Sequence, residues 1–375
     1  MPPRPALALA LASALALACG GAPSTAATAA VPAAGPPPGP VDGATGGVEG
    51  PEAGANSPAD AAAPAKTSAV ETPLTLDEGA ADPRGLGPEI STSIGSPADG
   101  SLVGGVRLPV RGPGYRYNPR KRDEARHAVV EVIQAVLAAA AAVDEALPGG
   151  EATIGELSLP EGGPISGHGS HQAGRDVDVL FYLLDAGGAP TPGHAVPIDP
   201  EGAGTDYKDL EIDTDDVPLK IDVPRTWRFV QALLEGDHAA VQRIFVVEHV
   251  RSMLLAEAKA VGAPAATIQR FEEVTCQPGF PHDDHLHIRF FCSVDDLAGG
   301  CTEMDPIYPW QVAALGAAGA KPIKARPRRK GTRPKLTTHA EARAKAGPMH
   351  PSVVEFLDRR AAWVKQPHPG RKYCK

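Results

Sequence analysis

Apolar side chains recur every three or four positions between Lys121 and Leu147, and the sequence Pro-Gly-Gly follows directly. Residues three and four apart share one face of an α-helix, so this spacing predicts a long amphipathic helix over 121–147. Proline and glycine disfavour its continuation, so we expect the helix to end at this sequence. The first predicted element is therefore a long helix with one face toward the core.

Two further helices are indicated later in the chain. One should be capped by Asp222 or Thr226 and run through Leu234, because both side chains can accept a hydrogen bond from the free N–H groups of a first helical turn. The other covers about 250–261, where apolar residues again recur at helical spacing.

Four short segments have the alternation or the short apolar run of a β-strand. They cover 153–159, 177–184, 243–247 and 285–291. Helices and strands are mixed along the chain but do not alternate regularly, as they would in a doubly wound parallel fold. The pattern therefore predicts the α+β class.

The N-terminus has the pattern of an export signal. Arg4 precedes a run rich in Ala and Leu that is too short to span a bilayer, and small residues lead up to Cys19. A cysteine directly after a small residue resembles a bacterial lipobox, in which the thiol carries a lipid anchor. We expect a signal peptide over 1–18 and a lipid on Cys19; the alternative is an ordinary cleaved signal with an incidental cysteine.

Composition divides the rest of the chain into three parts. Residues 20–84 have almost no large apolar side chains, so they cannot bury enough surface to offset chain entropy and should form a disordered tether. Residues 85–315 hold the predicted elements and should be the folded domain. Residues 316–375 should be a basic tail, because 16 Lys and Arg stand against 3 acidic residues from Lys321 onward.

Charge is therefore split between an acidic body and a basic tail, within a formal net charge of −9. The tail either meets an anionic partner or is simply solvated, and both interpretations stay open. The acidic body argues against a nucleic-acid-binding protein.

Export also makes the cysteines informative. Besides Cys19 the chain has four, an even number that suits disulfides in an oxidising compartment. Three pairings are conceivable. We favour Cys292 with Cys301, separated by a Gly-containing loop, which leaves Cys276 and Cys374 as the other pair.

Five of the 12 histidines fall in two short polar segments. The first reads Gly-His168-Gly-Ser-His171-Gln-Ala-Gly-Arg-Asp176-Val-Asp178-Val, and the second reads Pro-His282-Asp-Asp-His285-Leu-His287-Ile-Arg. Imidazole and carboxylate ligands suit a catalytic Zn²⁺, and the absence of cysteine from both segments argues against a closed structural zinc site. Alternate residues of a strand share a face, as Asp176 and Asp178 should, and likewise His285 and His287. A histidine in the loop before the first strand and a carboxylate within that strand could therefore meet a histidine of the other strand around a single metal.

The pattern H-x-x-H-x-x-G-x-D-x-D, followed by H-x-x-H-x-H, resembles the penicillin-insensitive murein endopeptidases over about 100–301. This family is related to lysostaphin-type zinc peptidases and D-Ala-D-Ala carboxypeptidases. The resemblance implies a small antiparallel sheet flanked by helices, with His171, Asp178 and His287 as the ligands of a single zinc. It also implies that His168 lies near a metal, as an additional ligand or in the substrate cleft.

The same residues suggest a mechanism. Zinc lowers the pKa of a bound water and polarises a scissile carbonyl. His285 lies one strand repeat from His287 and is predicted to act as the general base, while His282 could stabilise the oxyanion or contact the substrate. The chain has no H-E-x-x-H motif, which excludes a thermolysin-like arrangement.

Together these inferences predict a zinc peptidase that cleaves peptide cross-links of peptidoglycan, for example the bond from D-Ala to diaminopimelate. We expect it in the periplasm, lipid-anchored to the outer membrane. One alternative is a carboxypeptidase acting at a free D-Ala-D-Ala terminus. The other is a peptidoglycan-binding lipoprotein without turnover, although the presence of every candidate ligand and of His285 argues against it.

Overall fold

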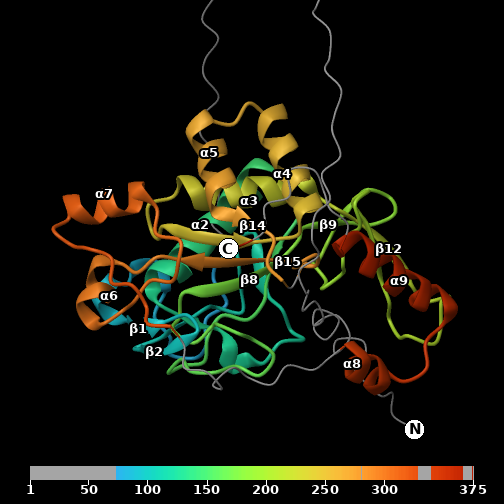
Figure 1. Cartoon of the computed structure of the whole chain (residues 1–375), viewed down its shortest axis with the longest axis horizontal. Coiled ribbons are helices and arrows are strands. Elements are labelled where there is room, and N and C mark those ends of the chain that lie inside the picture. The colour runs from blue at the N-terminus through green and yellow to red at the C-terminus, as the bar shows by residue number, and fades with distance from the viewer. Residues whose placement is uncertain (1–72, 280, 328–338, 366–373, 375) are drawn as a thin grey trace, which may run out of the picture. The chain divides into compact units, whose positions relative to one another are not determined.

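A mixed sheet of seven strands, ordered β14-β13-β15-β8-β7-β5-β4, forms the centre of the computed structural model (Figure 1). Its strands are β4 (Arg111–Gly112), β5 (Tyr115–Tyr117), β7 (Ala152–Ile154), β8 (Asp176–Leu180), β13 (Val241–Phe245), β14 (Thr275–Cys276) and β15 (His285–Phe290). The structure describes residues 73–279, 281–327, 339–365 and 374, and all of them belong to one compact unit.

The prediction of a small antiparallel sheet is wrong in two respects. The sheet is larger than expected, and the pairs β5–β7 and β13–β14 are parallel. Parallel neighbours require a long crossover. Helix α2 (Val130–Ala146) supplies it between β5 and β7, while α4 (Glu248–Ala260) and α5 (Ala265–Val274) supply it between β13 and β14. The α+β class itself is confirmed.

Three smaller sheets surround the main one. They consist of β1 (Thr92–Ser96) with β2 (Asp99–Val103), of β3 (Val106–Arg107) with β6 (His127–Ala128), and of β9 (Leu183–Leu184), β10 (Pro190–Thr191), β11 (Ala203–Asp206) and β12 (Val217–Ile221). The predicted strand over 177–184 is therefore divided between β8 and β9, and the predicted strand over 153–159 ends at Ile154.

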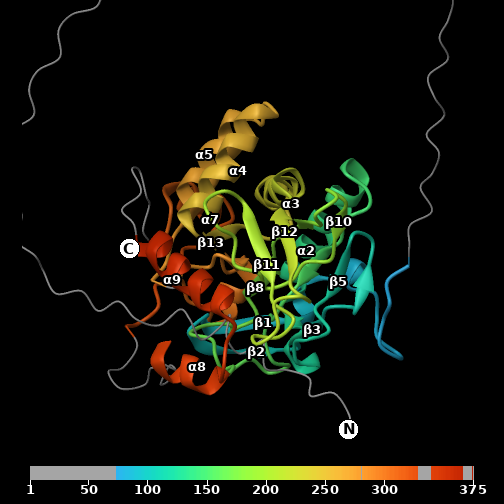
Figure 2. The ribbon, with the colours of Figure 1, turned by 90° about the vertical axis from the view of Figure 1, so that its right-hand side faces the viewer.

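The remaining helices include α3 (Val223–Glu235), α6 (Val294–Gly299), α7 (Pro309–Ala317), α8 (His339–Ala346) and α9 (Pro351–Lys365), with 3₁₀ turns at Pro83–Gly85, Pro88–Ile90 and Asp123–Ala125. Helices α3, α4 and α5 pack together on one side of the main sheet (Figures 1 and 2). None of the described helices is long and apolar enough to cross a bilayer.

The first helix begins nine residues later than predicted, at Val130. Before it, His127 and Ala128 pair with β3, and the guanidinium of Arg126 is buried against the carbonyl of Leu108 and the carboxylate of Asp77. These tertiary contacts hold the segment extended, although its apolar spacing continues the helical pattern.

The core covers one face of the central strands. Val177 and Val179 of β8 and Leu286 and Ile288 of β15 are almost completely buried, in one apolar cluster with the inner face of α2. Because strand side chains alternate, the intervening residues of both strands project from the opposite face. They include Asp176 and Asp178 of β8 and His285 and His287 of β15.

The folded part extends beyond the expected limits of 85 and 315. Leu74 packs against the core, and Thr75 pairs with Arg111. At the other end, α9 packs its apolar face on Tyr207 and Leu210, so this part of the expected basic tail is folded. The predicted signal peptide, Cys19 and most of the tether lie outside the described residues.

Both favoured disulfides are confirmed. Cys292 is bonded to Cys301, and Cys276 is bonded to Cys374. The second bond joins strand β14 to a residue near the C-terminus, 98 positions later.

Candidate metal centre

Strands β8 and β15 bring the two polar segments into register. They run antiparallel, with His287 directly opposite Asp178 and Arg289 opposite Asp176. Cross-strand partners have Cβ atoms about 5 Å apart, so their side chains meet on the face turned away from the core. The strand pairing therefore assembles the site from positions more than 100 residues apart in the chain.

The three predicted zinc ligands converge on this face. Nε2 of His171 lies 3.3 Å from Oδ1 of Asp178, and Nδ1 of His287 lies 3.4 Å from the same oxygen. The rings of His171 and His287 are 4.6 Å apart between centroids. All three side chains are buried.

These atoms fit a zinc ion. Nδ1 of His171 lies 2.7 Å from the carbonyl oxygen of Leu157, so it carries the proton and leaves Nε2 with a free lone pair. Within the described residues, His171 Nε2 and Asp178 Oδ1 are buried without a hydrogen-bond partner. Buried polar atoms rarely remain unsatisfied. Two imidazoles and a carboxylate are a donor set that catalytic zinc accepts, with a fourth position left for water.

Asp176 contacts both of the predicted ligand histidines. Its carboxylate accepts two hydrogen bonds from Arg289, at 2.8 and 3.0 Å, and one at 3.1 Å from the backbone N–H of His171. Its Oδ2 also lies 3.4 Å from Nε2 of His287. His171 has a φ of 69°, a left-handed conformation that costs a non-glycine residue on the order of 1 kcal/mol. We interpret that cost as offset by these contacts.

His168 lies at the edge of the group. Its Nδ1 is 3.8 Å from Oδ2 of Asp178, while its Nε2 is 2.8 Å from Oε2 of Glu156. Glu156 also accepts a hydrogen bond from Lys121 and pairs with Arg122. Nε2 of His168 thus faces the charged cluster around Glu156, and Nδ1 faces the predicted ligand Asp178. This arrangement is compatible with both predicted roles, an additional metal ligand or a residue of the substrate cleft.

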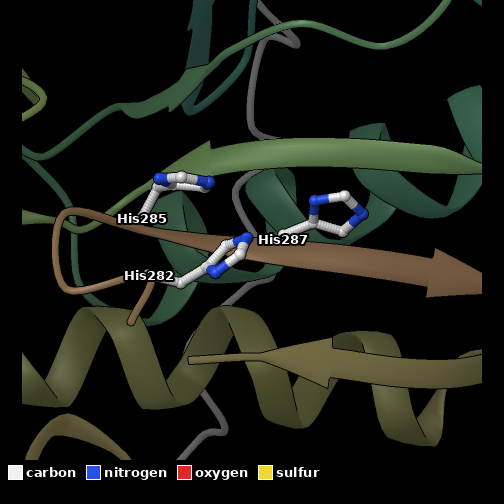
Figure 3. Close-up of side chains that lie close together, drawn as sticks. All are labelled: His282, His285 and His287. Atoms are coloured by element: carbon white, nitrogen blue, oxygen red, sulfur yellow. The ribbon is translucent and has the colours of Figure 1, made fainter. Parts of the chain in front are cut away.

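The second segment places two more imidazoles beside His287. Figure 3 shows His285 and His287 projecting from β15, with His282 reaching toward them from the preceding loop. Ring centroids are 4.9 Å apart for His282 and His285 and 5.5 Å apart for His282 and His287. Nδ1 of His285 is 2.6 Å from Oδ1 of Asp284, and its Nε2 is 3.5 Å from Oδ1 of Asp178. Nε2 of His285 therefore faces the predicted ligand Asp178, while Nδ1 is held by the carboxylate of Asp284.

The electrostatics suit metal binding. Burial lowers the pKa of His287 to about 4, despite the opposing charge of Asp176. Burial acts to raise the pKa of Asp178, but the charges of His171 and His285 hold it well below its usual range. A neutral imidazole and an ionised carboxylate are the forms that bind metal. For His285, burial alone would lower the pKa, but Asp284 and Asp178 raise it to about 9.

The structure thus brings together all six residues singled out in the sequence. Among the described residues, three overlapping groups have candidate ligand atoms within 4.8 Å of one another: His168, His171 and Asp178; His171, Asp176 and His287; and His282, His285 and His287. Which of these residues bind metal remains a prediction.

The sequence interpretation missed the residues that orient these side chains. Asp284 and Asp283 lie inside the H-x-x-H-x-H segment, where two consecutive acidic residues between histidines could have marked them. Glu156 had no such signal, because its partners Lys121 and His168 are distant in the chain. The same holds for Leu157, which acts through its backbone carbonyl.

Comparison with known proteins agrees with this geometry. The sequence model of a family described as penicillin-insensitive murein endopeptidase matches residues 93–311. That range contains every residue of the site described above and the whole of the main sheet.

Curated relatives carry the same description. A penicillin-insensitive murein endopeptidase of Pectobacterium atrosepticum is 27% identical over 221 residues, which are 55% of this chain and 66% of that protein. The similarly described proteins of Klebsiella pneumoniae and Escherichia coli are each 27% identical, over 58% and 56% of this chain and 72% and 70% of their own lengths. The matches therefore span about two thirds of these relatives.

Proposed function

Because the chain belongs to the penicillin-insensitive murein endopeptidase family, we propose that it is a zinc-dependent endopeptidase that cleaves peptide cross-links of bacterial peptidoglycan. The proposed bond is of the D-Ala to diaminopimelate type. The convergence of two imidazoles and a carboxylate on one face of β8 and β15 is the observation that carries the proposal.

His171, Asp178 and His287 would hold the zinc. When bound, zinc lowers the pKa of a coordinated water and polarises the scissile carbonyl. The chain itself supplies the orientation of the ligands. Leu157 fixes the tautomer of His171, and Asp176 lies between both histidines and Arg289.

His285 is placed to act as the general base. In the neutral form of His285, Nδ1–H donates to Asp284, and Nε2, which points toward Asp178, can accept a proton from water beside the proposed ligands. A zinc ion held by Asp178 would favour this neutral form, because it would offset the carboxylate charge that otherwise raises the pKa of His285 to about 9. His282 lies beside both strand histidines and is placed to donate a hydrogen bond to the developing oxyanion.

Digestion of purified peptidoglycan fragments tests the proposal. The zinc-loaded protein should convert cross-linked dimers into monomers in muropeptide chromatography. A chelator should abolish the conversion, and added zinc should restore it. The variant His171→Ala is the matched control, because it should lose zinc and activity together.

The alternatives predict other products. A carboxypeptidase would release D-Ala from uncross-linked fragments and leave dimers intact. A binding protein without turnover would retain peptidoglycan and change no fragment. Either result with fully zinc-loaded protein would overturn the proposed endopeptidase activity.

We further propose that the enzyme is periplasmic and attached to the outer membrane through a lipid on Cys19. Only the sequence supports this placement, through the short apolar run and the small residues before Cys19. A lipid anchor would keep the enzyme close to its insoluble polymeric substrate.

A further inference from the structure

Helix α9 lies beyond the family match, yet it reaches the loop that carries the catalytic histidines. Arg360 of α9 donates to both oxygens of Asp283, with Nε 2.8 Å from Oδ2 and Nη2 2.6 Å from Oδ1. Arg360 is 4% exposed and Asp283 is fully buried. Asp283 stands directly after His282 in the chain. The guanidinium of Arg360 is thus hydrogen-bonded to the middle of the H-x-x-H-x-H segment.

Backbone hydrogen bonds from two other segments also hold this loop. The backbone N–H of Val247 donates to the carbonyl of His282 at 3.1 Å, and the N–H of Ile198 donates to the carbonyl of Asp283 at 2.7 Å. His282 adopts a left-handed φ of 51°, so its conformation depends on contacts that hold the loop on both sides. The next residue, Asp284, orients His285. A shift at Asp283 would therefore reach both histidines.

Contacts that do not involve Arg360 also hold helix α9 in place. Its residues Val353, Phe356, Leu357 and Trp363 are buried with Leu210. The backbone of His350 donates to Leu210, and Cys374 is bonded to Cys276 at the start of the loop region. Replacement of Arg360 should therefore leave the helix in place.

The chemistry of the pair suits a role in positioning the loop. A buried ion pair is often no more stabilising than apolar residues of similar volume, but removal of one partner leaves an uncompensated buried charge. Without the guanidinium, the carboxylate of Asp283 would be buried beside Asp284. The loop would have to move to hydrate it.

We propose that Arg360 is a positioning residue, which sets the geometry of His282 and His285 by holding Asp283. This inference rests on the proposed function for its consequence in catalysis, but the loop geometry can be measured without it. The planar guanidinium bonds both carboxylate oxygens at once, which a single point charge does not do.

The test compares Arg360→Gln with Arg359→Gln in the full-length protein. Arg359 is the adjacent residue of α9, but it is exposed and pairs with Glu355 on the helix surface. Zinc content, thermal midpoint, kcat and KM are measured on the same preparations. We expect Arg360→Gln to keep its zinc and its KM within about threefold and to lose at least tenfold in kcat, while Arg359→Gln matches the wild type.

A double-mutant cycle with Asp283→Asn identifies the partner. If Arg360 acts through Asp283, the double variant should be no slower than the slower single variant. Effects that multiply, or an unchanged kcat in folded Arg360→Gln, would overturn the proposal. Should Arg360→Gln not fold, the double variant removes both buried charges and is compared with Asp283→Asn alone, which it should match.

Hydrogen exchange gives a measurement independent of activity. The amides of Val247 and Ile198 donate to the loop, so they should exchange at least tenfold faster in Arg360→Gln than in Arg359→Gln. The amide of Ile288, in the centre of β15, should be unchanged. If each of the three amides exchanges at the same rate in Arg360→Gln as in Arg359→Gln, the positioning role is contradicted. An inactive wild type with the expected exchange pattern would overturn only the proposed function.

Discussion

Three imidazoles of the site lie against groups that the proposal does not count among the metal ligands. The carbonyl of Leu157 fixes His171, the carboxylate of Asp284 fixes His285, and Asp176 lies against His287. Such partners decide which ring nitrogen carries the proton, and therefore which one is free to bind a metal or accept a proton. The proposed division of roles between ligand and base rests on this pattern.

The first prediction separates the ligand from the base. His287→Ala should lose zinc and activity together. His285→Ala should keep close to one zinc per chain and lose about 10²–10⁴-fold in rate, the usual range for a positioned acid–base group. Metal analysis and turnover on the same two preparations check this. If His285→Ala loses zinc as completely as His287→Ala, His285 is a ligand and His282 becomes the next candidate base.

A second prediction concerns Glu131, at the start of α2. Burial raises its pKa from 4.5 to about 7, and its Oε2 is buried without a hydrogen-bond partner among the described residues. Between these pH values the folded state binds more protons than the unfolded state. The free energy of unfolding should therefore fall as the pH rises through this window, on the order of 2 kcal/mol from this residue.

The variant Glu131→Gln should not show this fall in the free energy of unfolding with rising pH. Its unfolding free energy in urea should be close to that of the wild type at pH 4 and higher at pH 8, since glutamine stays neutral. Glu145→Gln, at an exposed position of the same helix, is the control and should show no such difference. An equal effect of Glu131→Gln at both pH values would contradict the burial of a protonated carboxyl.

At the level of single elements, the sequence left two candidates for the N-terminal cap of α3, Asp222 and Thr226. The side chain of Asp222 accepts from the backbone N–H of Arg225, and Thr226 donates its hydroxyl to the carbonyl of Asp222. Asp222 is therefore the cap, and Thr226 lies in the first turn. Arg225 also donates to the carbonyls of Leu147 and Pro148, which follow the end of α2.

Replacement of Asp222 tests this arrangement. Asp222→Ala should lower the free energy of unfolding by about 1–2 kcal/mol, because the cap is lost. Asp222→Asn keeps a capping oxygen and should recover part of the loss. Urea denaturation of both variants measures the difference, and an alanine variant as stable as the asparagine variant would contradict the capping role.

Across the whole molecule, the C-terminal part joins the catalytic domain. Contacts between residues far apart in the chain make this connection. Among them are the packing of α9 on Leu210, the Arg360–Asp283 ion pair and the Cys276–Cys374 disulfide. The basic residues of 328–338 and 366–373 lie outside the described residues, so an anionic partner for them remains a prediction.

The opposite end of the chain carries the proposed anchor. Cys19→Ser should move the protein from the membrane fraction to the soluble periplasmic fraction, because acyl chains would be the main source of membrane affinity. Fractionation with metabolic lipid labelling checks this. Wild-type protein that stays in the membrane fraction without incorporating lipid would count against a lipid on Cys19.

Local patterns in the sequence were sufficient for several conclusions. The paired histidine motifs predicted the family, which the match over 93–311 confirms. Alternation along 285–291 predicted β15, and the cysteine count led to both disulfides. These features depend on side-chain spacing within a few residues or on residue type, so a single sequence contains them.

The tertiary structure alone decided which distant residues meet. Only the antiparallel register of β8 and β15 places His287 opposite Asp178, and only the long crossovers make two strand pairs parallel. The bond between Arg360 and Asp283 spans 77 positions and has no local pattern. Contacts of this kind depend on how buried surfaces and charges are satisfied together across the whole fold, and neighbouring residues in the sequence do not encode that balance.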